Sequence, residues 1–264
     1  MIKKILLVIR YFRFRIKAKS RYNIHSQFVY SFIGDILRDK TIYPDYEILW
    51  NHRNKMASSN DPIETVDFGF GAGKKAYSTH IYPLSKIVKL RSHSEPRLRL
   101  LYRIVKHYKP QTVLEFGTAA GISATYIKSG NPESTMISME GCSTLASKAK
   151  ESFDELGLGN IELAVGNFDN MLDEVLGKFS RLDFVFFDGN HRKEPTLMYF
   201  NSCAKLSTEN SIFVFDDIHW SLGMEEAWNN IKEDERVSIT IDLFWFGLVF
   251  FRKGIEKQNF NLVV

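Results

Sequence analysis

The chain has few cysteines and no long apolar run. Two of its 264 residues are cysteines, Cys142 and Cys203, so neither a disulfide framework nor a cysteine zinc site is indicated. Charges interrupt residues 1–22 well short of the ~20 apolar residues of a membrane span. The same segment lacks the apolar core and cleavage site of a signal peptide. No internal repeat is visible. These absences predict a cytoplasmic protein, and the length of 264 residues predicts one large domain, or a core with an extension.

The charge is small overall but unevenly placed. A net charge of +4 does not indicate a nucleic-acid-binding composition, and 44% hydrophobic residues suffice for a buried core. Residues 1–22 contain no acid and eight basic residues: Lys3, Lys4, Arg10, Arg13, Arg15, Lys17, Lys19 and Arg21. Between these lie apolar residues at helical spacing: Ile2, Ile5, Ile9, Phe12 and Ile16. Such a segment suits an anionic membrane surface or nucleic acid. The simpler interpretation, which we favour, is a helix packing its apolar stripe on the domain with its basic residues in water.

From about residue 95 the sequence alternates between helical and strand patterns. Helices are predicted at 97–108, from about 123, and at 144–156, 169–176, 195–206 and 224–231. Strands are predicted at 112–116, 135–140, 161–165, 182–187 and 211–215, followed by a hairpin of 237–244 and 248–252. The alternation predicts an α/β fold with a parallel sheet, to which the hairpin adds one antiparallel strand. Before residue 90 we expect an irregular region, with one helix at 23–37 and a loop at 51–62. The predicted division is an N-terminal helical extension over residues 1–94 and a domain over residues 95–264.

A glycine turn after the first of these strands is the most informative feature. The apolar strand passes Glu115 into Gly117 and Gly121, and a helix opens near Ser123. Glycine lets the backbone approach a ligand closely, and the N–H groups of the following helix then face that ligand. About twenty residues on, the second strand ends in Glu140, where a carboxylate can accept hydrogen bonds from ribose hydroxyls. The pair predicts a nucleoside-cofactor site, although a plain tight turn also explains the glycines alone.

With this spacing the chain resembles class I S-adenosylmethionine-dependent methyltransferases, in particular the metal-dependent catechol and caffeoyl-CoA O-methyltransferase branch. The resemblance covers about residues 95–254 and implies a Rossmann-like seven-stranded sheet, six strands parallel and one antiparallel. It implies that Glu115 and Gly117 line the methionine end of the cofactor and that Glu140 holds the ribose. It places further cofactor contacts at Thr118, Gly121, Ser123, Gly141, Asn167, Phe168 and Asp188. Cys142 is expected to help frame the adenosine. The spacing differs from that of nicotinamide-binding domains, which argues against an oxidoreductase.

Acidic residues end the two strands that follow. Asp188 follows 182–187, and Asp216 and Asp217 follow 211–215, so parallel strands would bring all three to one edge. Carboxylate clusters of this kind suit Mg²⁺, Mn²⁺ or Ca²⁺. In the family that the chain resembles, an Asp at the position of Asp188 and an Asp-Asn pair at the positions of Asp216 and Asp217 hold a divalent ion. Because Asp217 replaces the usual Asn, the site here would carry one more negative charge. The alternative is that Asp188 and Asp216 only cap the following helices.

Two histidines and one further loop complete the candidates. His191 stands where the family carries a lysine general base, and imidazole can accept a hydroxyl proton near neutral pH. His219 is a candidate fourth metal ligand, a group supporting the ligands, or a base. Residues 67–74 resemble a glycine-rich cofactor loop but are expected to be a flexible loop. The predicted function is transfer of a methyl group to the hydroxyl of a small molecule. The alternative is a non-catalytic protein that binds the cofactor or a partner, and the oligomeric state is open.

Overall fold

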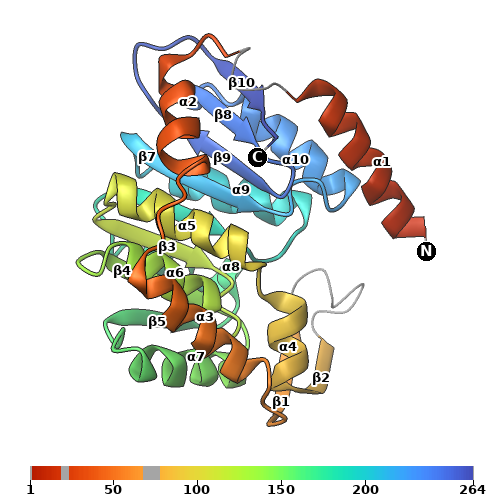
Figure 1. The fold of residues 1–264 in the computed structure, drawn as a ribbon, viewed down its shortest axis with the longest axis vertical. Coiled ribbons are helices and arrows are strands. Elements are labelled where there is room, and N and C mark those ends of the chain that lie inside the picture. Colours follow the sequence, from red (N-terminus) through yellow and green to blue (C-terminus); the bar gives the residue numbers. More distant parts are fainter. Residues whose placement is uncertain (1, 19–23, 68–77, 264) are drawn as a thin grey trace. The chain divides into compact units, whose positions relative to one another are not determined.

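The structure, a computed structural model, describes residues 2–18, 24–67 and 78–263 (Figure 1). It consists of two compact units. The central unit comprises residues 40–179, and the terminal unit comprises residues 1–39 and 180–264. Strands and helices alternate in both, so the predicted α/β class is confirmed.

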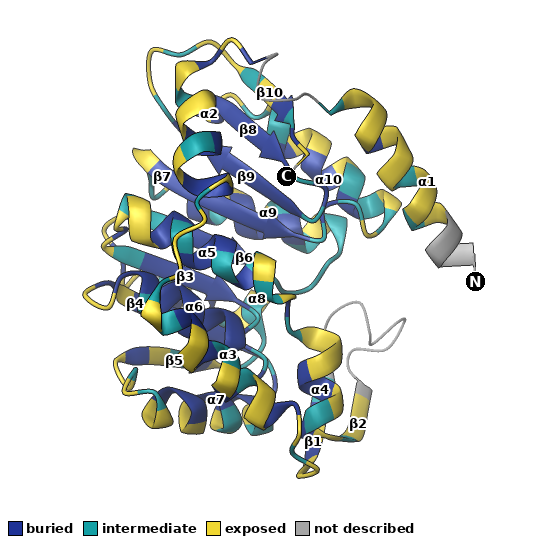
Figure 2. Cartoon of the chain, in the orientation of Figure 1, coloured by how far each residue is buried: buried dark blue, intermediate teal, exposed yellow. Residues whose placement is uncertain are grey.

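The central unit contains three parallel strands in the order β3-β4-β5. These strands are β3 (Thr112–Phe116), β4 (Thr135–Glu140) and β5 (Ile161–Val165). Four helices of this unit precede or follow these strands in sequence: α5 (Glu95–Tyr108), α6 (Ile122–Gly130), α7 (Ser143–Glu155) and α8 (Phe168–Leu176). All seven elements were predicted, and only their ends shift. The near-complete burial of β3 and β4 explains why their sequences read as apolar runs (Figure 2).

The prediction of an irregular region before residue 90 was wrong. Residues 40–91 form helix α3 (Pro44–Met56), a hairpin of β1 (Pro62–Asp67) and β2 (Ser78–Pro83), and helix α4 (Leu84–Arg91). Helix α3 covers much of the predicted 51–62 loop. Its buried face is Tyr46, Leu49, His52 and Met56, so a histidine occupies one turn of the apolar stripe. The apolar stripe of α3 was not recognised because a histidine stands within it. The burial of His52 depends on a partner from another helix, the Ser152 hydroxyl at 2.5 Å.

The terminal unit contains five strands in the order β10-β8-β9-β7-β6. They are β6 (Leu182–Phe187), β7 (Ser207–Asp216), β8 (Ile239–Asp242), β9 (Phe246–Phe250) and β10 (Gln258–Asn261). The helices α9 (Lys193–Ala204) and α10 (Leu222–Glu233) flank β7 in sequence. Strands β8 and β9 form the predicted hairpin, and β9 is antiparallel to β7. Strand β10, parallel to β8, was not predicted and goes beyond the expected seven-stranded sheet.

Two N-terminal helices also belong to the terminal unit. The helix predicted at 23–37 is α2 (Gln27–Phe32), which continues as a π-helical turn η2 (Ile33–Leu37). Helix α1 (Ile2–Lys17) is present, but the favoured packing of its apolar stripe was wrong. Ile9, Phe12 and Ile16 are exposed, and over residues 6–17 of α1, where side chains are described, the buried one is Phe14. Spacing identifies a stripe, but it does not say which side of a helix meets the body of the protein.

The remaining sequence-level expectations concern single features. The glycine-rich loop predicted at 67–74 lies outside the described residues, apart from Asp67 at the end of β1. Cys142 and Cys203 are buried thiols. Within the described ranges, none of the helices combines the length and apolar composition needed to cross a bilayer.

Candidate active site

The glycine turn between β3 and α6 has the backbone that its sequence predicts. Gly117 and Gly121 have φ values of 95° and 83°, and Ala119 between them has a φ of 47°. The N–H groups of Gly117 and Thr118 donate to the Met139 carbonyl of β4 at 2.9 and 3.0 Å. Gly121 is the left-handed residue from which α6 begins. The turn is therefore tied to the neighbouring strand, with its glycines where a Cβ would cost most.

Glu140 at the end of β4 closes this turn. Its carboxylate accepts hydrogen bonds from the backbone N–H groups of Ala119 at 2.7 Å and Cys142 at 2.8 Å. Burial raises the pKa of Glu140, although these hydrogen bonds and the positive charge of Arg91 act in the opposite direction. An ionised carboxylate has about four acceptor positions, of which these bonds use two. The remaining positions suit a pair of hydroxyl donors such as those of a ribose.

A buried polar chain supports the turn from below. Glu115 is fully buried and accepts a hydrogen bond from the Ser138 hydroxyl at 2.5 Å. Ser138 in turn accepts from the Thr118 hydroxyl at 2.5 Å, since its own proton is given to Glu115. The two strands and the turn are thereby joined through side chains as well as backbone. The implied contact of Glu115 with the methionine end of a cofactor stays a prediction.

The other residues of the predicted cofactor site lie in the central unit as well. Ser123 is buried in the first turn of α6, and Gly141 follows Glu140 and is half-buried. The Asn167 side chain caps α8, accepting from the Asp169 N–H at 2.9 Å. The ring of Phe168 meets that of Phe116 edge-on, with centroids 5.8 Å apart. The capping and ring contacts are structural roles, and the implied cofactor contacts of Asn167 and Phe168 stay predictions.

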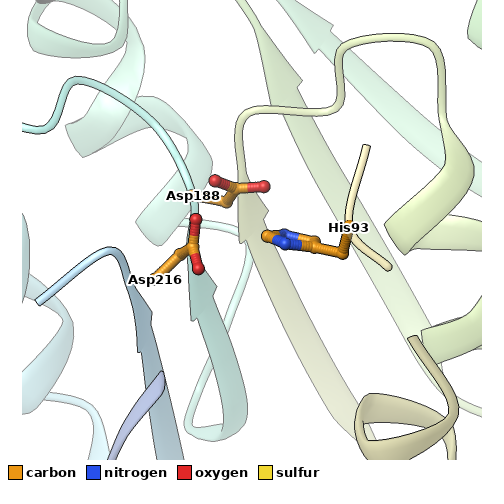
Figure 3. Close-up of side chains that lie close together, drawn as sticks. All are labelled: His93, Asp188 and Asp216. Atoms are coloured by element: carbon orange, nitrogen blue, oxygen red, sulfur yellow. The ribbon is translucent and has the colours of Figure 1, made fainter. Parts of the chain in front are cut away.

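The structure brings the predicted acidic residues of the terminal unit together. Asp188 follows β6 and Asp216 ends β7, and their carboxylates lie close together (Figure 3). The third side chain labelled in that figure, His93, belongs to the central unit. The ligand atoms of Asp216, Asp217 and His191 lie within 4.8 Å of one another. His191 Nε2 is 3.6 Å from Asp188 Oδ1. All four predicted residues therefore form one cluster, which we call the acidic cluster.

Helix capping does not account for the acidic cluster. The residue at the N-cap of α9 is Arg192, and α10 is capped by Ser221, whose hydroxyl accepts from the Met224 N–H at 3.1 Å. Asp216 is 5% exposed, which is unusual for a carboxylate. Asp217 has a left-handed φ of 53°, a conformation that Asp and Asn tolerate better than other non-glycine residues.

The acidic cluster fits a divalent cation. Its three carboxylates are oxygen ligands of the kind that Mg²⁺ or Mn²⁺ prefers. Two residues after Asp188, the buried Oδ1 of Asn190 has no hydrogen-bond partner within the described part of the chain. An amide oxygen of this kind is a further ligand for a hard cation. The sequence signal for Asn190 is its position two residues after Asp188.

His219 is engaged by carboxylates at both ring nitrogens. Nδ1 lies 3.0 Å from Glu225 Oε1, and Nε2 lies 2.9 Å from Asp242 Oδ2. In this arrangement no ring nitrogen is left for a metal or a substrate proton. Burial alone would lower the pKa of His219, but the hydrogen bonds and charges of Asp242 and Glu225 outweigh it and raise that pKa. His219 therefore supports the loop after Asp217. The sequence did not reveal the role of Asp242, because this residue of β8 reaches His219 only through the pairing of strands.

The raised pKa of His219 predicts a pH-dependent contribution to stability. The contribution is complete below the unfolded pKa of about 6.5 and is lost as pH rises through the higher folded pKa. His219→Gln removes it, on the order of 1–3 kcal/mol. We expect the difference in unfolding free energy between wild type and variant to shrink with rising pH in thermal or urea unfolding. The control is His107→Gln, since that exposed histidine of α5 lies outside the network. A difference that grows with pH would contradict the assignment.

Known proteins are similar to this chain over both the glycine turn and the acidic cluster. Residues 114–218, from β3 to just beyond β7, match the family model described as "Methyltransferase domain". Residues 114–218 are therefore similar to a methyltransferase domain. The matched residues include the glycine turn, Glu140 and the acidic cluster.

Two curated relatives match this chain over part of their length. An O-methyltransferase, imqG, of Aspergillus flavus is 32% identical over 120 residues, which are 43% of this chain and 46% of that protein. A tRNA (guanine-N(7)-)-methyltransferase of Mycoplasma mobile is 30% identical over 80 residues, 30% of this chain and 40% of that protein. The chain thus spans less than half the length of these relatives. Their names differ in the methyl acceptor, which this similarity does not decide.

Solved structures share the fold more widely. The structure of the S-adenosylhomocysteine-bound methyltransferase PaMTH1 of Podospora anserina superposes with a TM-score of 0.62 at 14% identity. The alignment covers 87% of this chain and 97% of that one. The chain therefore shares the Rossmann-like fold of that structure, as the resemblance implied.

Proposed function

We propose that this chain transfers the methyl group of S-adenosylmethionine to the hydroxyl oxygen of a small molecule, with help from a divalent cation. The observation that carries the proposal is the buried Glu140 carboxylate, held against the glycine turn by the N–H groups of Ala119 and Cys142. We also propose that residues 95–264 form the catalytic domain, that residues 1–94 are its extension, and that the protein works in the cytoplasm.

In the central unit the residues bind and orient. Glu140 accepts hydrogen bonds from the ribose hydroxyls, and the left-handed turn from Gly117 to Gly121 lets the backbone approach the cofactor. Thr118, Ser123, Gly141, Asn167 and Phe168 complete the contacts. S-adenosylmethionine, when bound, would supply an electrophilic methyl group on a sulfonium, with the neutral thioether as the leaving group. Positioning of the acceptor oxygen against that methyl group would account for most of the rate.

In the terminal unit the acidic cluster activates the acceptor. Asp188, Asp216 and Asp217 would hold the cation, and a divalent cation, when bound, lowers the pKa of a hydroxyl that it contacts. His191 Nε2 faces Asp188, so His191 Nδ1 is the atom that takes the hydroxyl proton. The proton passes to His191, and the oxygen forms the new bond.

Calorimetric titration with S-adenosylmethionine, with Mg²⁺ and again with EDTA, tests the cofactor directly. We expect a micromolar dissociation constant in both conditions, because the cofactor residues need no metal. Methyl transfer from labelled cofactor to a library of hydroxyl compounds and to tRNA then identifies the acceptor class. Absence of binding in both titrations would favour the non-catalytic alternative and overturn the proposal.

A pair of aspartate variants tests the cation. Asp216→Asn removes a buried charged ligand and is expected to weaken Mn²⁺ binding about tenfold or more. Asp217→Asn removes one charge without straining the left-handed backbone, so we expect only a several-fold loss, roughly 1 kcal/mol. Electron paramagnetic resonance of free Mn²⁺ during titration measures both. Asp173→Asn, an exposed aspartate of α8, is the matched control. Equal affinity of Asp216→Asn and this control would remove the cation from the proposal.

A further inference from the structure

Helix α1 has two faces with apolar side chains, and one of these faces packs against the rest of the terminal unit. Phe14 is 5% exposed, and its ring lies 5.5 Å from that of Phe244. On the opposite side of the helix, Ile9, Phe12 and Ile16 are 43%, 63% and 84% exposed. Their spacing of i, i+3 and i+7 places them in a single helical stripe. Leu6 and Val8 are also exposed, at 44% and 53%. Figure 2 shows most of α1 as exposed. We call Ile9, Phe12 and Ile16 the outer stripe.

Helix α1 is held firmly by its inner face. Arg10 Nε donates to Glu225 Oε2 at 3.0 Å, and Arg10 Nη1 donates to the carbonyl of Trp220 at 3.2 Å. The ring of Tyr11 meets that of Phe244 at a centroid distance of 5.0 Å. The inner contacts therefore fix which side of α1 is turned outward. Exposure of the outer stripe is a consequence of how the helix is mounted.

The charge around the outer stripe indicates what covers it. Arg13, Arg15 and Lys17 are exposed on α1, and residues 1–22 contain eight basic residues and no acid. Apolar side chains at helical spacing, interleaved with lysine and arginine, are the pattern of a helix that lies in the interface of an anionic bilayer. We propose that α1 docks this protein on an anionic lipid surface, with the outer stripe in the acyl boundary and the basic residues at the headgroups.

Other occupants fit these residues less well. Nucleic acid would engage the basic residues through its phosphates and has no need of three large exposed apolar side chains. If a second copy packed against this one helix to helix, two segments with basic and no acidic residues would lie together, and their positive charges would repel each other. An anionic bilayer satisfies both the charge and the apolar stripe.

Vesicle flotation of the full chain tests the proposal. The probes are phosphatidylcholine vesicles with and without phosphatidylglycerol, at low and high salt. We expect wild type to float with the anionic vesicles, less so at high salt, and not with the neutral ones. The variant Ile9→Ser/Phe12→Ser/Ile16→Ser is expected to lose about tenfold or more in partitioning, because the side chains that enter the acyl boundary are gone.

The matched control replaces three apolar residues that are equally exposed elsewhere. Ile42→Ser/Ile48→Ser/Leu90→Ser changes side chains that are 84%, 58% and 72% exposed and is expected to float like wild type. Thermal unfolding of both variants checks that the fold is kept. Three results would overturn the proposal: no flotation of wild type, flotation that survives loss of the outer stripe, or a vesicle-free dimer that only the outer-stripe variant disrupts. Binding of RNA in place of anionic vesicles, insensitive to the outer stripe, would also overturn it.

Discussion

Replacement of Glu140 by alanine is expected to weaken S-adenosylmethionine binding about a hundredfold or more. Each hydrogen bond to a charged acceptor contributes roughly 1.5–3 kcal/mol, and the variant loses two from the ribose. It also leaves the N–H groups of Ala119 and Cys142 without their acceptor, which loosens the turn itself. Calorimetric titration with S-adenosylmethionine and S-adenosylhomocysteine measures the loss.

A control and a pH series separate binding from folding. Glu162→Ala removes a glutamate from the neighbouring strand β5, where it pairs with Lys178 at the surface, and is expected to bind like wild type. Because burial raises the pKa of Glu140, we expect wild-type affinity to fall on acidification at a higher pH than for an exposed glutamate. Glu140→Gln should lack that dependence. Affinity of Glu140→Ala equal to that of Glu162→Ala would reduce Glu140 to a structural residue.

Gly121→Ala is expected to be the most destabilising single substitution in the glycine turn between β3 and α6. The left-handed φ of 83° costs an alanine roughly 1–2 kcal/mol. Its Cβ would also lie 2.8 Å from Phe153 Cε1 and 3.2 Å from the Ala149 Cα of α7. Backbone at that distance cannot move aside cheaply, so overpacking adds about 1–3 kcal/mol. Urea unfolding should show a loss of roughly 2–5 kcal/mol, together with weaker cofactor binding.

Gly157→Ala is the matched control for this substitution. Gly157 has a similar φ of 69°, but nothing lies within 4 Å of an added Cβ. It therefore reports the cost of the left-handed backbone alone, roughly 1–2 kcal/mol. The difference between the two variants is the overpacking against α7. Equal losses in the two would show that α6 and α7 are not packed as tightly at Gly121 as the structure has them.

Local patterns predicted much of the fold. Buried parallel strands read as apolar runs, as Phe184 to Phe187 of β6 do, and the helices between them show a regular apolar period. The failures came where a polar residue takes an apolar position, as His52 does in α3, or where a strand is short, as β10 is. Such elements depend on a partner elsewhere in the chain, here Ser152 for His52 and β8 for β10.

The candidate site divides in the same way. Because parallel strands end at one edge, the order of strands in the sequence was enough to group Glu140 with the glycine turn and Asp188 with Asp216 and Asp217. The roles of His219 and Asn190 needed the folded chain. Both nitrogens of His219 meet carboxylates that lie 6 and 23 residues away, and the buried state of Asn190 Oδ1 is a property of packing.

The sequence by itself determined the α/β class, the glycine turn and the acidic strand ends, because periodicity, glycine and charge act over a few neighbouring residues. The tertiary structure decided which groups are already engaged and which faces remain open. His219 is taken up by Asp242 and Glu225, and α1 turns its outer stripe to solvent because Arg10 and Phe14 fasten the opposite side. Those outcomes depend on long-range contacts, whose partners no local pattern specifies.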